Sequence, residues 1–364
     1  MPMPTRRVTR EVHIGDALTI GGDHPIVVQT MTKTDTRDVP ATLEEIFRLV
    51  QAGCEMVRLA VLDRQAAEAL AKIKAASPIP IVADIHFDYR LALIALQSGV
   101  QKLRLNPGNI GSPERVRAVV TEAKSRGVPI RIGVNAGSLE KDLIEKYGHP
   151  TPEAMVESGM RHLEILDDLN FDQVIISLKA PEVALTVDAY RLFSRQSDVP
   201  LHLGITESGT VWSGSIRSSV GLGILLSEGI GDTIRVSLSG PAEEEVKVAR
   251  EILRATDRRV FGPTVYACPT CGRCEIDLQK VAAEVEQRVS GFTVPLRISV
   301  MGCVVNGPGE AKESDVGLAG GRGFGFLYKN GEIAGKVSQE EMVDRLVDEV
   351  RRLDEEAKAS AESR

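Results

Sequence analysis

Short apolar runs alternate with amphipathic stretches along the first two thirds of the chain. Each run is too short for a helix, and most are rich in Val and Ile, which is typical of strands buried on both faces. The eight runs are Pro25–Met31, Met56–Val61, Ile79–Ile85, Lys102–Leu105, Pro129–Val134, Gln173–Leu178, Pro200–Ile205 and Thr233–Leu238. The stretches that follow them predict the helices Thr42–Gln51, Arg64–Ala76, Tyr89–Gln97, Pro113–Ser125, Pro152–Leu169, Val183–Ser194, Ser215–Ser227 and Ala242–Ala255.

Eight regular strand–helix units within residues 25–257 predict a TIM (β/α)8 barrel, an α/β fold, with a doubly wound open sheet as the alternative. Residues 1–24 precede the first strand as an N-terminal extension, which we expect to form a small hairpin under the barrel floor. A capping-box pattern, Thr42-Leu43-Glu44-Glu45, predicts that the first barrel helix begins at Thr42.

The pattern changes after residue 257. Residues 258–263 are typical of a linker, and residues 264–353 predict a smaller α+β domain. Its expected elements are the helix Glu275–Val289, the strand Leu296–Val300, the Gly-rich segment Gly317–Gly325, the strands Phe326–Tyr328 and Glu332–Lys336, and the helix Gln339–Leu353. Lys329-Asn330-Gly331 predicts a hairpin turn between the last two strands. Residues 354–364 are expected to form a mobile tail.

Composition narrows the class of function. A net charge of −7 and a single Trp argue against a nucleic-acid binder. No apolar run reaches the roughly 20 residues that span a membrane, and the basic, polar N-terminus lacks the apolar region of a signal peptide, so we expect a cytoplasmic protein. Five cysteines, odd in number and clustered, favour a metal site over a disulfide framework.

Polar residues stand at the ends of the predicted strands, where TIM barrels place their active sites. Four arginines, each between apolar neighbours, and one lysine are expected there: Arg58, Arg104, Arg131, Arg235 and Lys179. Each arginine alone could be a structural ion pair, but together these cations outnumber the local acids Asp84 and Glu207. The pattern therefore predicts a substrate with several negative charges. The other candidate substrate contacts are His86, Asn106, Asn135, His202 and Ser237.

Two short runs hold four of the five cysteines. They are Cys268-Pro269-Thr270-Cys271-Gly272-Arg273-Cys274 and Gly302-Cys303-Val304-Val305-Asn306-Gly307-Pro308-Gly309-Glu310. Because Cys303 has no CxxC partner, the spacing favours a 4Fe–4S cluster over tetrahedral zinc, with unligated thiols as a third alternative. Spacing alone makes Cys274 a ligand, while Glu310 could be a replaceable fourth ligand. Cys54 is expected in the core.

Six motifs resemble those of the 4-hydroxy-3-methylbut-2-enyl diphosphate synthase family, in its short two-domain bacterial form. They are Val82–Arg90, Leu105–Gly111, Arg131–Lys141, Leu201–Glu207, Ala267–Arg273 and Gly302–Glu310. The resemblance implies a TIM barrel followed by an iron–sulfur domain similar to those of sulfite and nitrite reductases. It also implies one 4Fe–4S cluster per chain, held by Cys268, Cys271, Cys303 and Glu310, with Cys274 as a bystander.

The resemblance further implies an activity. The reaction is the reductive ring opening and dehydroxylation of 2-C-methyl-D-erythritol 2,4-cyclodiphosphate to (E)-4-hydroxy-3-methylbut-2-enyl diphosphate, in the methylerythritol phosphate pathway of isoprenoid biosynthesis. Electrons are expected from flavodoxin or ferredoxin, and the chain is expected to form a head-to-tail homodimer in which one chain's cluster closes the other's barrel. Glu207 is the expected catalytic proton donor. The alternative is a zinc-containing barrel that binds or transforms a phosphorylated metabolite without redox chemistry.

Overall fold

The computed structural model of the protein describes residues 4–362, so residues 1–3 of the expected extension and 363–364 of the expected tail lie outside it. The chain divides into two compact units, Met1–Arg259 and Val260–Arg364. Within the described residues, no helix combines the length and the apolar character that crossing a membrane requires.

The first unit is a parallel barrel, which confirms the predicted fold. Its strands are β3 (Val27–Met31), β4 (Met56–Ala60), β5 (Ile81–Asp84), β6 (Lys102–Arg104), β7 (Ile130–Asn135), β8 (Val174–Lys179), β9 (His202–Leu203) and β10 (Thr233–Ile234). They are ordered β8-β7-β6-β5-β4-β3-β10-β9, and a parallel bridge between Ile176 and Leu201 joins β8 to β9. Strands β9 and β10 are shorter than predicted. The apolar runs that predicted them continue beyond the last paired residues, because Ile205 and Val236 are buried without belonging to a strand.

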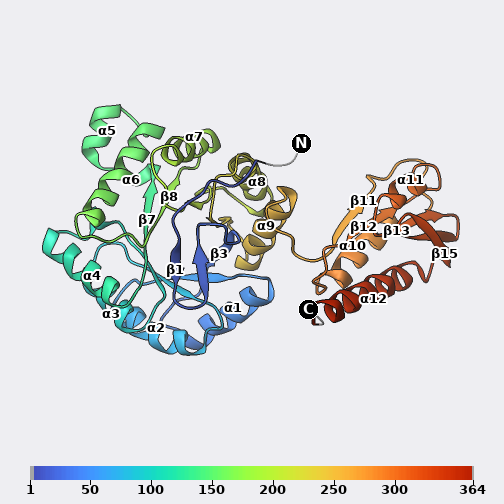
Figure 1. Ribbon diagram of the computed structural model, residues 1–364, viewed down its shortest axis with the longest axis horizontal. Coiled ribbons are helices and arrows are strands. Elements are labelled where there is room, and N and C mark those ends of the chain that lie inside the picture. Colours follow the sequence, from blue (N-terminus) through green and yellow to red (C-terminus); the bar gives the residue numbers. More distant parts are fainter. Residues whose placement is uncertain (1–3, 363–364) are drawn as a thin grey trace. The chain divides into compact units, whose positions relative to one another are not determined.

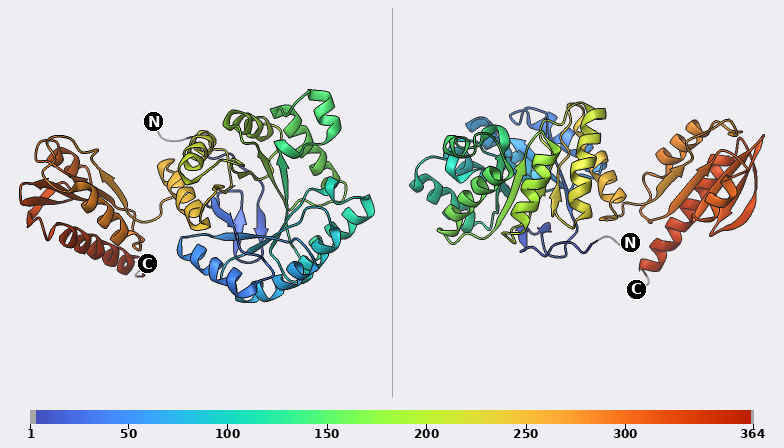
Figure 2. Two further views of the ribbon diagram at one scale, coloured as in Figure 1. Left: turned by 180° about the vertical axis from the view of Figure 1, so that it is seen from behind. Right: turned by 90° about the horizontal axis from the view of Figure 1, so that it is seen from above.

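Helices surround these strands on the outside of the barrel (Figures 1 and 2). They are α1 (Val39–Gln51), α2 (Arg64–Ala76), α3 (Tyr89–Gln97), α4 (Pro113–Ser125), α5 (Lys141–Tyr147), α6 (Pro152–Asp167), α7 (Val183–Ser194), α8 (Val211–Ser227) and α9 (Ala242–Ala255), with the short 3-10 turns η1 (Pro107–Asn109) and η2 (Ala136–Ser138). The sequence did not predict α5.

The predicted start of α1 is wrong. The helix begins at Val39, where the Asp38 carboxylate accepts a hydrogen bond from the N–H of Ala41. Thr42 is buried inside the helix, and its hydroxyl donates to the carbonyl of Asp35. Asp38 is a favourable N-cap residue, and Pro40 is favourable in the first helical turn. These two residues, which precede the capping-box pattern, therefore set the start of the helix.

The expected N-terminal hairpin is present. Strands β1 (Val12–Ile14) and β2 (Leu18–Ile20) pair antiparallel. Val12, Ile14 and Ile20 pack against Val27, Met56, Val82 and Ile175, which lie near the beginnings of barrel strands. The hairpin therefore closes the barrel at the end opposite the strand C-termini.

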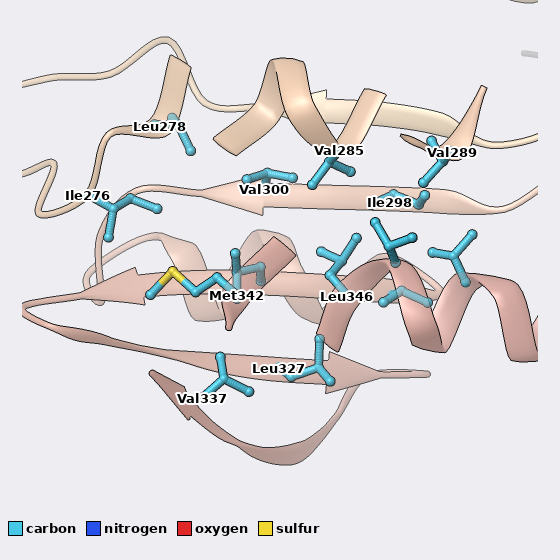
Figure 3. Packing of buried hydrophobic residues seen from close by; sticks show 14 residues of the cluster. Ile276, Leu278, Val285, Val289, Ile298, Val300, Leu327, Val337, Met342 and Leu346 are labelled. Carbon is cyan, nitrogen blue, oxygen red and sulfur yellow. The ribbon is translucent and has the colours of Figure 1, made fainter. Parts of the chain in front are cut away.

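The second unit is a five-stranded mixed sheet with helices on both faces. Its elements are β11 (Thr264–Ala267), α10 (Leu278–Val289), β12 (Arg297–Met301), α11 (Gly307–Lys312), β13 (Val316–Gly321), β14 (Phe324–Lys329), β15 (Glu332–Ser338) and α12 (Met342–Glu362), with the strands ordered β11-β12-β13-β14-β15. Aliphatic side chains of α10 and α12 pack on one face of the sheet (Figure 3). On the other face, Ala311 of α11 packs against Ala319 and Tyr328.

The Gly-rich segment, to which the sequence assigned no element, forms β13 and the start of β14. A Cβ at Gly317 would lie 2.6 Å from the carbonyl oxygen of Ala311, and one at Gly320 would lie 2.7 Å from Ile276 Cδ1. These glycines therefore permit close packing on the sheet. The predicted hairpin turn is confirmed, since Asn330 and Gly331 have positive φ angles between the paired residues Lys329 and Glu332.

The expected start of the tail is wrong, because α12 continues through Glu362. Asp354 is only 2% exposed, and its Oδ1 accepts hydrogen bonds from the N–H groups of Thr293 and Val294. Burial alone would raise the pKa of Asp354, but hydrogen bonds from Lys358 and from these N–H groups lower it to about 2.

The variant Asp354→Asn should therefore destabilise the protein at neutral pH. A carboxylate whose pKa is lowered by folding stabilises the fold above its unfolded pKa, and this contribution is lost as the pH falls towards about 2. We expect a loss of about 1–3 kcal/mol in the free energy of unfolding at pH 7 and a clearly smaller loss at pH 2.5, measured by urea denaturation. The exposed neighbour Glu355, changed to Gln, is the control and should stay within about 0.5 kcal/mol. Equal effects of the two variants at pH 7 would contradict the assignment.

Candidate active site

The C-terminal ends of the barrel strands enclose a cavity of about 210 Å³. Nine residues predicted for the mouth line it: Arg58, Asp84, His86, Arg104, Arg131, Asn135, Lys179, Arg235 and Ser237. Gly133, Ser177 and Thr206 line it as well, and the sequence had not singled them out. The arginines within the apolar strand runs thus indicated the cavity correctly, because alternate residues of a barrel strand point towards the barrel interior.

Five cations in this lining face a single carboxylate, that of Asp84. Its Oδ1 lies 3.3 Å from Arg104 Nη1, and its Oδ2 lies 3.7 Å from Arg58 Nε and 3.5 Å from His86 Nε2. Burial would raise the pKa of Asp84, but Arg58, His86 and Arg104 together hold it far below its usual range. Asp84 is therefore ionised and fixes two of the arginines.

Arg235 has a different partner, Glu245 of α9, which is only 2% exposed. The Glu245 Oε2 lies 3.3 Å from Arg235 Nη2, and Oε1 lies 3.4 Å from Lys33 Nζ. The N–H of Leu238 also donates to Oε1, at 3.1 Å. The sequence analysis missed this carboxylate. The available signal was its position in the helix, since Glu245 shares the buried face with Ala242, Val246 and Ala249.

The remaining two cations lack a carboxylate partner among residues 4–362. Arg131 Nη1 donates to Ser177 Oγ at 2.7 Å, while its Nε and Nη2 have no partner there. Burial, together with the charges of Arg58 and Arg104, lowers the pKa of Arg131. Burial and the charges of Arg131 and Arg235 likewise lower the pKa of Lys179. The cavity thus carries positive charge that the described side chains leave unbalanced.

A sixth cation, Lys102, is fully buried outside the lining. Its Nζ donates to Gln29 Oε1 at 3.0 Å. Burial, Arg131 and Arg58 lower its pKa well below the ordinary value.

Three predicted site residues do not line the cavity. The Asn106 side chain is clamped to Gly133, donating to its carbonyl at 2.9 Å and accepting from its N–H at 2.7 Å. His202 is completely buried, and burial and the charge of Lys179 lower its pKa, so the ring is neutral. Glu207 is exposed in an adjoining depression that it shares with Lys33 and Arg235.

The two cysteine runs leave the same end of the second unit's sheet. Strands β11 and β12 are parallel neighbours, with Ala267 opposite Val300. The N–H of Cys268 donates to the carbonyl of Val300 at 3.3 Å, and the N–H of Glu275 donates to that of Gly302 at 2.8 Å. The fold therefore brings the two runs together from a distance of about thirty residues in sequence.

The thiols differ in their surroundings, and all five cysteines are free. Cys303 is 9% exposed, and the backbone N–H groups of Asn306 and Val305 lower the pKa of its thiol. Cys268 is half-buried and Cys271 is exposed. Cys274 instead donates through Sγ to the carbonyl of Ile276 at 3.3 Å. Cys54 is buried in the barrel, as expected.

Among residues 4–362, no three or more His, Cys, Asp or Glu side chains are grouped so that they could hold a metal ion. The donor set nevertheless fits an iron–sulfur cluster by its chemistry. The soft thiols of Cys268, Cys271 and Cys303 lie in segments that follow the neighbouring strands β11 and β12, and the exposed Glu310 of α11 adds a carboxylate.

Comparisons with known proteins cover nearly the whole chain. Residues 9–250 match the family model described as the GcpE TIM-barrel domain, and residues 264–352 match that of the GcpE protein C-terminal domain. The 4-hydroxy-3-methylbut-2-en-1-yl diphosphate synthase (flavodoxin) of Geobacter sulfurreducens is 59% identical over 345 residues, which cover 95% of this chain and 98% of that protein. The synthase of the same name from Brevibacillus brevis is 55% identical over 353 residues, covering 97% and 98%.

Solved structures support the barrel fold alone. Dihydropteroate synthase from Stenotrophomonas maltophilia aligns with a TM-score of 0.51 at 12% sequence identity, covering 68% of this chain and 97% of that chain.

The two buried lysines, Lys102 and Lys179, offer a matched test of the cavity's charge. Lys179→Met and Lys102→Met each remove a buried cation from a crowded site, so each should stabilise the ligand-free protein, by about 1–4 kcal/mol in urea denaturation. Only Lys179 lines the cavity. Calorimetric titration with inorganic pyrophosphate should therefore show at least about tenfold weaker binding for Lys179→Met and a change of less than about threefold for Lys102→Met. Equal losses of affinity would contradict a ligand site centred on the cavity.

Proposed function

Because the chain belongs to the GcpE family, we propose that it catalyses the reductive ring opening and dehydroxylation of 2-C-methyl-D-erythritol 2,4-cyclodiphosphate to (E)-4-hydroxy-3-methylbut-2-enyl diphosphate. This is the reaction of the isoprenoid pathway expected from the sequence motifs. The observation that carries the proposal is the barrel cavity, whose five cations face one carboxylate.

The cations bind and orient the cyclic diphosphate. Asp84 and Glu245 hold Arg58, Arg104 and Arg235 in place before the substrate arrives, so little reorganisation is needed on binding. Arg131 and Lys179 supply the unbalanced charge that offsets the phosphate groups and stabilises the leaving phosphate oxygen. The remaining polar groups of the lining, His86, Asn135, Thr206 and Ser237, donate hydrogen bonds to the substrate. The Ser177 hydroxyl instead donates to the carbonyl of Ile132 at 3.3 Å and accepts from Arg131, so it orients that arginine. Asn106 and His202 support the cavity from behind its wall.

Cys268, Cys271, Cys303 and Glu310 hold one 4Fe–4S cluster per chain. When bound, the cluster supplies single electrons and a Lewis-acidic iron. Cys274 lies outside the ligand set, because its thiol is engaged with the carbonyl of Ile276. The names of the relatives support flavodoxin as the electron donor, with ferredoxin as the alternative.

Glu207 donates the proton to the departing hydroxyl group. It follows Thr206, which lines the cavity, and it shares an adjoining depression with Arg235 and Ser237. Its φ of +51° is a backbone conformation that non-glycine residues seldom adopt, and such positions cluster at functional sites.

The protein works as a head-to-tail homodimer. An apolar stripe on α8 supports self-association: Trp212, Ile216 and Val220 are spaced four residues apart and are 79%, 48% and 49% exposed. A second copy would remove these side chains from water.

Anaerobic purification tests the cofactor. We expect a coloured protein with about four iron and four sulfide ions per chain. Cys268→Ser, Cys271→Ser and Cys303→Ser should each lose most of the cluster iron. Cys274→Ser, the matched control from the same cysteine run, should retain it. A colourless protein with stoichiometric zinc would refute the redox function, and loss of iron in Cys274→Ser would refute the ligand set.

The variant Glu207→Gln tests the proton donor. It keeps the size of the side chain but removes the acidic proton, so kcat with an artificial one-electron reductant should fall by about 100-fold or more. Binding of the substrate should change little, because Glu207 does not line the cavity. Glu182→Gln is the control, an exposed glutamate after β8 that is also outside the lining. An unchanged kcat in Glu207→Gln would exclude this role.

A further inference from the structure

A buried histidine joins the turns that follow β6 and β7. His162 of α6 is 3% exposed, and its Nδ1 accepts a hydrogen bond of 3.2 Å from the N–H of Gly108 in η1. Its Nε2 lies 3.2 Å from Oε1 of Glu140, which follows η2. The hydroxyl of Ser158 donates to the same carboxylate oxygen at 3.1 Å. One imidazole thus bridges two turns at the mouth end of neighbouring strands.

These contacts define the protonation of the ring. Because Nδ1 accepts from a backbone N–H, the proton of the neutral ring is on Nε2 and is donated to Glu140. The hydrogen bond from His162, opposed by partial burial, lowers the pKa of Glu140 to about 2, so the carboxylate is ionised at neutral pH. The ring also packs closely on the turn, since a Cβ at Gly108 would lie 2.7 Å from His162 Cε1.

The turn held by His162 is continuous with the cavity wall. The N–H of Asn109 donates to the Asn106 carbonyl at 2.9 Å, which closes η1 on the residue that clamps Gly133. Gly133 lines the cavity, and a Cβ there would lie 2.7 Å from Arg104 Nε. Arg104 Nη2 also donates to the Gly133 carbonyl at 3.3 Å.

We propose that His162 is a positioning residue for anion binding in the barrel cavity. Through Nδ1 it holds η1, and through Asn106 and Gly133 this turn sets the place of the Arg104 guanidinium. Glu140 keeps the ring in the tautomer that this task needs. The inference rests on the proposed function for the identity of the anion, but its test requires no cluster.

Two amide variants separate the two bonds of the ring. In His162→Asn the side-chain oxygen can replace Nδ1 as the acceptor for Gly108, while in His162→Gln the amide reaches the position of Nε2 and preserves only the donation to Glu140. Calorimetric titration with inorganic pyrophosphate should give a Kd within about threefold of the wild type for His162→Asn. For His162→Gln and His162→Ala the Kd should rise by about 10- to 100-fold. With the loaded enzyme, KM for the substrate should rise more than kcat falls.

Ser158→Ala is the matched control, because it removes one hydrogen bond to Glu140 and leaves the ring bonded on both sides. Its Kd should equal that of the wild type. Gly108→Ala supplies a second route if the histidine variants fail to fold, since its added methyl group displaces the ring and should also raise the Kd. A lower melting temperature with unchanged pyrophosphate affinity, in His162→Gln or Gly108→Ala, would overturn the proposal and leave a purely structural histidine. Failure of the wild type to bind pyrophosphate would instead count against the proposed substrate site.

Discussion

Repulsion among buried cations is the constraint on which the barrel mouth depends. Five positive side chains share a cavity of about 210 Å³, and the low dielectric of the surroundings strengthens every interaction between them. Asp84 and Glu245 neutralise part of this charge, and an anionic ligand must balance the rest. Any ligand that binds only the folded state adds stability by mass action, about 2.7 kcal/mol at a concentration of 100 Kd. Binding of the substrate should therefore balance the charge of the cavity and stabilise the folded protein.

The parts of the barrel around the cavity can be understood as supports for this arrangement. Glu245 reaches inward from α9 to anchor Arg235, and Asn106 clamps Gly133 beneath Arg104. His162 extends the same support to the turns outside the strands. Each of these side chains is a buried polar group with specific hydrogen-bond partners. Such a group destabilises the fold if its bonds are not all made, and it holds its neighbours rigidly if they are. Preorganised cations can then stabilise charge that develops on the leaving phosphate without first moving into place.

Sequence patterns predicted the inward-facing cations better than their partners. Arg58, Arg104 and Arg131 stand out because each interrupts an apolar strand, so the strand period alone places them inside the barrel. Glu245 lies in a run of three glutamates, and only its alignment with the apolar face of the helix distinguishes it from the other two. The role of a glycine is equally hard to predict from sequence. In β13 the glycines allow α11 and the Ile276 side chain to pack closely on the sheet, whereas Gly331 in the Asn330-Gly331 turn allows a positive φ. The sequence gives the position of each glycine, but whether close packing or a positive φ requires it depends on residues that are distant in sequence.

The neighbouring parallel strands β11 and β12 have a consequence for how the protein matures. Backbone hydrogen bonds between them set the separation of Cys268 and Cys303, and the core behind them consists mainly of aliphatic side chains of α10, α12 and the sheet. Folding of this unit therefore has its own driving force, in contrast to zinc fingers, whose metal replaces a core. This core contains no metal ligand that its packing requires, so we expect the polypeptide to fold before the proposed cluster binds, with Cys271 exposed beside the site. If the proposed cluster is lost, the unit should therefore stay folded and able to bind a new one.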